Sequence, residues 1–140
     1  MDLSIHHLHH VNHWAVLVSA LILWFLGAVW YSPGLFAKPW MAALGIVPTG
    51  PRKGLAAGMI SSFIGDVLVA FVLLHFVLWS GASTLGMGAF VGFLSWLGFF
   101  AATQFPQGIY EGRPMKLFII NSGYWLVGLL IIGALLAAWK

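Results

Sequence analysis

Four long apolar segments constrain this chain more than any other feature of its sequence. Crossing a bilayer takes about 20 mostly apolar helical residues, and each segment is that long. Backbone groups in lipid must satisfy their own hydrogen bonds, and the segments do not alternate in polarity as barrel strands would. We therefore predict an all-α fold, an integral membrane four-helix bundle. Its single domain (1–140) has spans at about 12–31, 55–79, 84–104 and 115–139.

The composition agrees with this architecture. Of the 140 residues, 61% are hydrophobic and only 6% are charged. A soluble domain carries about 25% charged residues, so this chain cannot cover a water-facing surface. The lipid bilayer is the expected partner. The few basic residues form no stripe, which gives no support for binding nucleic acid.

The basic residues predict the topology. Five of the six Lys and Arg lie in the links after the first and third spans: Lys38, Arg52, Lys53, Arg113 and Lys116. Lys and Arg in short loops favour the cytoplasmic side. We expect both of these links to be cytoplasmic and both termini to face outward, in a bacterial inner membrane. Four helices leave much lateral surface, so a homo-oligomer, with a dimer favoured, is also expected.

Two similar segments follow the first and third spans. Residues 33–41 and 106–115 both read Pro, Gly, aliphatic, aromatic, basic-Pro and Met when small gaps are allowed. In each segment a helix would stop at the proline and turn through the glycine. The likeness favours two hairpins related as a parallel internal repeat, although Pro- and Gly-rich loops can also be alike by coincidence. Residues 38–45 are compatible with a short interfacial helix.

Asp66 is the most informative residue, because it lies near the middle of the second span. A carboxylate at the bilayer centre costs at least about 2.5–3.5 kcal/mol, so it should face other helices or water. Gly54, Gly58 and Ser62 precede Asp66 at every fourth position, and small residues at this spacing let helices approach closely. Asp66 is then either an ion or proton site or a hydrogen-bonding residue that fixes helix packing.

Further polar side chains are expected to gather at the cytoplasmic ends of the first, third and fourth spans. They are Tyr31, Ser32, Gln104, Asn121, Ser122 and Tyr124. Either they line a vestibule that leads toward Asp66, or each forms ordinary hydrogen bonds between helices. Gly88 and Gly92 form a small-xxx-small motif in the third span, which packs within the bundle or across a dimer interface.

Histidines cluster ahead of the first span. On a helix, His6 and His10, and likewise His9 and His13, would be four residues apart and could share a metal ion. His75, near the outer end of the second span, could add a third nitrogen. Imidazole suits Zn, Cu or Ni, but the cluster could equally be a polar arm without a physiological ligand. No cofactor is required by this sequence.

Two motifs carry a family resemblance. One is the run Gly27-Ala-Val-Trp-Tyr-Ser-Pro33 with Phe36 and Lys38-Pro-Trp-Met41 after it, and the other is Glu111-Gly-Arg-Pro114 followed by Leu117-Phe-Ile-Ile-Asn-Ser-Gly-Tyr124. With Asn12 and the residues after it, these motifs resemble the bacterial multi-pass membrane family called domain of unknown function 1761. The resemblance covers nearly the whole chain and implies a small multi-pass membrane protein. It implies no activity.

No enzyme is predicted. The sequence has no cysteine, no HExxH motif, no phosphate-binding glycine loop and no paired intramembrane carboxylates. The leading hypothesis is transport or permeation of a small solute, ion or proton through a buried ionisable site at Asp66. One alternative is a non-catalytic membrane scaffold or accessory subunit. Another is an outward-facing metal-binding protein built on the histidine arm.

Overall fold

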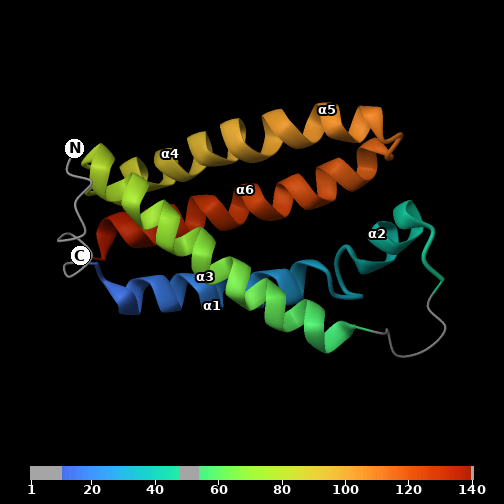
Figure 1. Cartoon of the computed structure of the whole chain (residues 1–140), viewed down its shortest axis with the longest axis horizontal. Coiled ribbons are helices and arrows are strands. Elements are labelled where there is room, and N and C mark those ends of the chain that lie inside the picture. Colours follow the sequence, from blue (N-terminus) through green and yellow to red (C-terminus); the bar gives the residue numbers. More distant parts are fainter. Residues whose placement is uncertain (1–10, 48–53, 140) are drawn as a thin grey trace.

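The computed structural model describes residues 11–47 and 54–139, and every regular element within them is helical (Figure 1). The first span is α1 (His13–Trp30), the second is α3 (Leu55–Ser80) and the fourth is α6 (Met115–Ala138). The third span is continuous through α4 (Leu85–Ser95), the π-helical segment η2 (Trp96–Ala101) and α5 (Ala102–Tyr110). These four helices are long and apolar enough to cross a membrane, which confirms the predicted four-helix membrane bundle.

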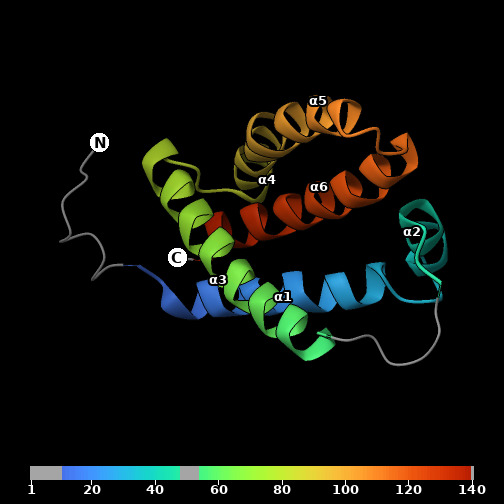
Figure 2. The same ribbon diagram turned by 45° about the vertical axis from the view of Figure 1, so that its right-hand side comes forward.

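Successive spans run in opposite directions. The described ends of the chain and the α3–α4 link lie at one end of the bundle, while α2 (Ala37–Leu44) and the α5–α6 turn lie at the other (Figures 1 and 2). Asn12 Nδ2 donates a hydrogen bond to the Trp139 carbonyl over 3.3 Å and so joins the first and last helices. Lys38 on α2 and Arg113 in the α5–α6 turn therefore share one end of the molecule.

The short helix expected at 38–45 is present as α2. Gly45 ends it in the left-handed conformation, with φ of 73°. The amides of Gly45 and Ile46 donate to the carbonyls of Ala42 and Met41, which is a Schellman ending. A glycine is favoured here because it adopts positive φ without a steric penalty.

The closest helix contact in the bundle is between α4 and α6. A Cβ atom on Gly88 would overlap the carbonyl of Gly133, and one on Gly92 would overlap the carbonyl of Leu129. Without Cβ atoms the two backbones come within van der Waals contact, which maximises dispersion and permits Cα–H···O contacts. The small-residue motif of the third span therefore packs within the bundle, against a glycine that the sequence analysis did not single out.

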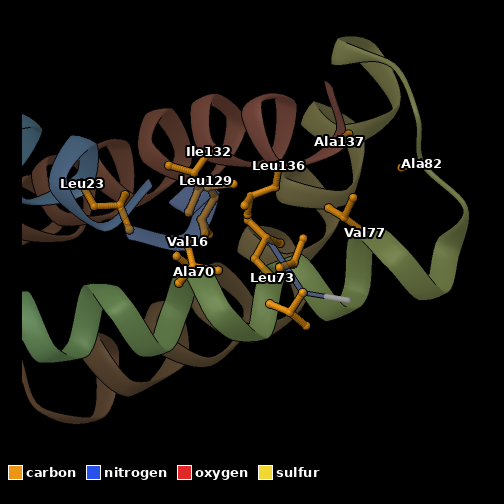
Figure 3. Packing of buried hydrophobic residues seen from close by; sticks show 13 residues of the cluster. Val16, Leu23, Ala70, Leu73, Val77, Ala82, Leu129, Ile132, Leu136 and Ala137 are labelled. Carbon is orange, nitrogen blue, oxygen red and sulfur yellow. The ribbon is translucent and has the colours of Figure 1, made fainter. Parts of the chain in front are cut away.

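A second set of contacts holds α1, α3 and α6 together. Figure 3 shows Val16 beside Ala70, and Leu73 of α3 below Leu136 of α6. All four side chains are buried. Lipid is as apolar as these side chains, so close packing rather than water exclusion stabilises this core.

The third span differs from its predicted extent. We expected it to stop before Phe105 and Pro106, but it continues to Tyr110 with Pro106 inside α5. Proline lacks an amide hydrogen and crowds the preceding turn. The six-residue π-helical segment η2 lies just ahead, and Thr103 Oγ1 donates to the carbonyls of Phe99 and Phe100. These adjustments lie just before Ala102, whose carbonyl would receive the amide hydrogen that Pro106 lacks, and membrane helices tolerate proline where local adjustments of this kind occur.

The two Pro-Gly segments are therefore not equivalent. Pro33 lies in the turn after α1, where the helix does stop, whereas Pro106 lies within a helix. The expectation that each proline marks the same event is wrong. Two hairpins are present, α1 with α3 and α4–α5 with α6, but the motifs that suggested an internal repeat do not occupy matching positions.

We expect Gly92→Ala to lower the thermal stability of the purified protein. The added methyl group would push α4 away from α6, and overpacking of this kind costs about 1–3 kcal/mol. Gly86→Ala is the matched control, because a Cβ atom at Gly86 on the same helix would meet no other atom within 4 Å. Equal melting temperatures for the two variants in detergent would contradict the proposed α4–α6 contact.

Candidate functional site

Asp66 lies in the interior of the bundle near the middle of α3. At 1.5 Å per residue it is about 17 Å from Leu55 and about 21 Å from Ser80 along the helix axis. Its side chain is only 5% exposed, and it begins the buried stripe of α3 that continues through Ala70 and Leu73. Among the described residues Asp66 makes no hydrogen bond and no ion pair. It is thus a buried carboxyl group without a neutralising partner in the described part of the chain.

The contacts between α1 and α3 show what lies opposite Asp66. Trp24 Nε1 donates to the Met59 carbonyl over 3.1 Å, and the rings of Trp24 and Phe63 pack edge to face. The two helices are antiparallel. Moving from Met59 and Phe63 along α3 to Asp66 therefore corresponds to moving from Trp24 back along α1 to about Ser19. Ser19 is completely buried, and its hydroxyl has no hydrogen-bond partner among the described residues. A second unsatisfied polar group therefore lies at the depth of Asp66.

Tyr124 of α6 approaches the same region from the third helix. Its hydroxyl donates to the Leu23 carbonyl over 2.7 Å, and it is near enough to Asp66 for the two groups to interact electrostatically. Gly27 makes room for it, since a Cβ atom there would lie 3.2 Å from the tyrosine oxygen. Tyr124 thus connects α1 and α6 beside the carboxyl group of α3.

A polar pair extends from Tyr124 toward the end of the bundle that carries α2. Tyr31, just after α1, donates from its hydroxyl to Asn121 Oδ1 over 2.6 Å, and its ring packs edge to face on Tyr124 at 5.7 Å. Asp66, Tyr124, Tyr31 and Asn121 therefore form a succession of polar groups from mid-span toward that end.

The other members of the predicted polar group have separate partners. Ser32 Oγ donates to the Val29 carbonyl of the helix before it, and Ser122 Oγ to the Ile119 carbonyl of its own helix. Gln104 is exposed and lines a small pocket of about 60 Å³ between α5 and α6, together with Asn121. The structure thus joins Tyr31, Asn121 and Tyr124 and leaves Ser32, Gln104 and Ser122 outside their contacts.

The small residues ahead of Asp66 do not form a packed surface within the chain. Gly54 and Gly58 have no atom near enough to meet an added Cβ, and Ser62 is exposed. The first half of α3 crosses α1 at an angle (Figure 2) and contacts it through Met59 and Phe63 rather than through these small residues. Close packing on this stripe begins only at Asp66 and continues to Ala70.

Sequence reasoning also missed three tryptophans that connect helices. The indole nitrogens of Trp24, Trp30 and Trp96 donate to the backbone carbonyls of Met59, Ile120 and Ser122 on other helices. An indole N–H in lipid needs an acceptor, and for Trp24 and Trp96 the position away from a span end is the signal for such a bond, whereas Trp30 at the end of α1 carries no such signal. Sequence reasoning also missed Ser19, whose signal is that it is the only serine within the first span.

The predicted metal site lies largely beyond the described residues, which exclude His6, His9 and His10. His13 is exposed at the start of α1. His75 is buried on α3, with Nδ1 2.8 Å from the Phe71 carbonyl and its ring between Phe71 and Trp79. Residues 11–47 and 54–139 contain no group of three acidic or histidine side chains that could hold a metal. Binding of Zn, Cu or Ni stays a prediction.

Comparison with known families tests the family resemblance that the two sequence motifs indicated. The model of the family described as protein of unknown function (DUF1761) matches residues 14–137, which is most of the chain. The chain belongs to the DUF1761 family. Within this DUF1761 chain the match includes Asp66, Tyr31, Asn121 and Tyr124. Comparisons with curated proteins and with solved structures gave no match.

We expect Tyr124→Phe to lower stability by about 1 kcal/mol, because it removes the hydroxyl that bonds to Leu23. Gly27→Ala should act through the same hydroxyl by displacing it. Its effect should therefore shrink when Tyr124 is already phenylalanine, which a double-mutant cycle of melting temperatures measures. Fully additive effects would show that Gly27 and Tyr124 are not coupled.

Proposed function

We propose that this membrane protein transports or conducts a proton or small cation, with Asp66 as the group that binds it. The observation that carries the proposal is the burial of Asp66 without a neutralising partner among the described residues. An ionised carboxylate in such a place costs several kcal/mol. Binding a proton or a cation removes that cost, so occupancy of the site is favourable and exchange of the occupant is its natural chemistry.

The neighbouring groups support exchange at this position. Ser19 offers an unpaired hydroxyl at the depth of Asp66, which could contribute an oxygen ligand to a cation. Tyr124 and then the hydrogen-bonded Tyr31 and Asn121 continue from Asp66 toward the α2 end. Hydroxyl and amide groups in succession are suitable for passing a proton or stripping water from an ion. This is the direction in which we propose that the site is reached.

The proposal includes an orientation. Lys38 and Arg113 lie at the α2 end, and the positive-inside tendency favours the cytoplasmic side for that end. Tyr31 and Asn121 would then lie toward the cytoplasm and both termini would face outward, in the inner membrane of a bacterium. A homodimer is part of the proposal, because the exposed Gly54, Gly58 and Ser62 leave a smooth surface on α3.

The test is flux into liposomes that contain the purified protein. We expect the wild type to move protons, Na⁺ or K⁺ along an imposed gradient, and Asp66→Asn to reduce that rate to the level of empty liposomes. Asparagine keeps the shape of the side chain and removes its charge. Ion-sensitive dyes inside the liposomes measure the rates.

Glu111→Gln is the matched control, because it neutralises the other described carboxylate, which is paired with Arg113 in the α5–α6 turn. It should leave flux unchanged. Absence of flux from the wild type with all three ions would overturn the proposal. Should Asp66→Asn then also lower the melting temperature, the result would favour a scaffold or accessory subunit in which Asp66 only fixes packing.

A further inference from the structure

An apolar groove of about 390 Å³ opens between α3, the π-helical segment η2 and α6. Pockets for small organic ligands have volumes of about 300–1,000 Å³. Four aromatic residues contribute to its walls: Phe76, Phe99, Phe100 and Trp125. The groove exists because α4 is held against α6 by the glycine contacts while α3 packs mainly on α1, so that α3 and η2 diverge. The lining residues belong to membrane-spanning helices, so the groove lies within the depth of the bilayer.

The groove and Asp66 are neighbours on two helices. On α3 the groove is lined by Leu68, Val69, Val72, Leu73 and Phe76, and Asp66 itself does not line it. At 100° per residue Val69 and Leu73 lie about 60° and about 20° around the helix from Asp66, so they form the edge of the groove nearest to it. On α6, Trp125 lines the groove, while the adjacent Tyr124 interacts electrostatically with Asp66. The rings of Tyr124 and Trp125 are in edge-to-face contact at 5.0 Å. The groove therefore ends about one helical turn from the unneutralised carboxyl group.

We propose that this groove and Asp66 together bind an organic cation with a large apolar body. The inference rests on the proposed function, in which Asp66 binds an exchangeable cation, and adds a second class of cation to it. Charge complementarity selects this occupant: the carboxylate requires a positive partner, and aromatic faces attract cations while the apolar walls accept hydrocarbon. A lipid acyl chain would fill the groove but leave Asp66 without a counter-charge. A bare metal ion would pair with Asp66 but leave the groove unfilled.

The test is equilibrium binding of tetraphenylphosphonium to the purified protein in detergent, with tetraphenylborate as a probe of the same shape and opposite charge. We expect the cation to bind saturably and the anion to bind at least about tenfold more weakly, since loss of a buried charge pair is costly. Asp66→Asn should weaken binding of the cation by about tenfold or more. Equal binding of both probes, as a site for lipid chains would give, overturns the proposal.

A second variant keeps the test informative if Asp66→Asn does not fold. Val72 lines the groove and is 46% exposed, so Val72→Trp should fill the groove without disturbing the core. It should abolish binding of tetraphenylphosphonium. Ile64→Trp is the matched control on the same helix, because Ile64 is 56% exposed and lies outside the groove. Undiminished binding by Val72→Trp would exclude the groove.

The flux assay separates this inference from the proposed function. Flux of protons or alkali cations without binding of tetraphenylphosphonium overturns the organic-cation site and leaves the proposed function standing. Binding of tetraphenylphosphonium that depends on Asp66, without flux of protons or alkali cations, supports the site and overturns the proposed function. Absence of both overturns both.

Discussion

A carboxyl group in the middle of a membrane-spanning helix is the constraint on which the rest of this structure depends. Asp66 cannot face lipid without a large cost, so α3 must turn that side of itself toward α1 and α6. The other helices meet this demand only in part. Tyr124 lies near Asp66 and Ser19 lies at its depth, but neither neutralises it. The bundle therefore shields the carboxyl group from lipid without satisfying it, which is the arrangement that a site for an exchangeable cation needs.

The packing elsewhere follows a different principle. Gly88, Gly92 and Gly133 let α4 and α6 touch through their backbones, and that pair is the most closely packed in the chain. The other hairpin, α1 with α3, is held by larger side chains and by the indole of Trp24. Because α4 and α6 pack more closely than α1 and α3, the two hairpins cannot contact each other along their whole length. The apolar groove between α3 and η2 is the result, and it lies beside the one helix that carries the buried acid.

Much of this architecture could be read from the sequence, because lipid leaves a chain few choices. Apolar length located the four spans, and glycine spacing at Gly88 and Gly92 indicated a close contact. The partner of that contact could not be predicted, because a small-residue motif says only that some backbone approaches. Pro106 was misjudged as a helix end, since a proline signals a lost hydrogen bond but does not by itself end a membrane helix that has a π-helical segment just before it.

The candidate site was predictable in its centre and not in its surroundings. Asp66 is recognisable in the sequence as a lone acid in an apolar segment. Tyr31, Asn121 and Tyr124 were expected near one another because they lie at similar depths in the membrane, and they are in contact. Ser32, Gln104 and Ser122 share that depth but not the direction in which the side chains point, and depth alone cannot distinguish the two groups. Tertiary packing brings α3 against α1 through residues other than Gly54 and Gly58, which leaves no local signal in the sequence.

The most direct test of the central claim is chemical labelling of Asp66 by a hydrophobic carbodiimide in membranes, mapped by mass spectrometry. Such reagents modify protonated carboxyl groups within lipid, and the chain has only three acidic residues to compare. The account predicts that Asp66 is labelled, that a lower pH speeds the reaction, and that an added metal or organic cation which binds there slows it. Labelling at a rate that no proton, metal or organic cation concentration changes would contradict an exchangeable site at Asp66.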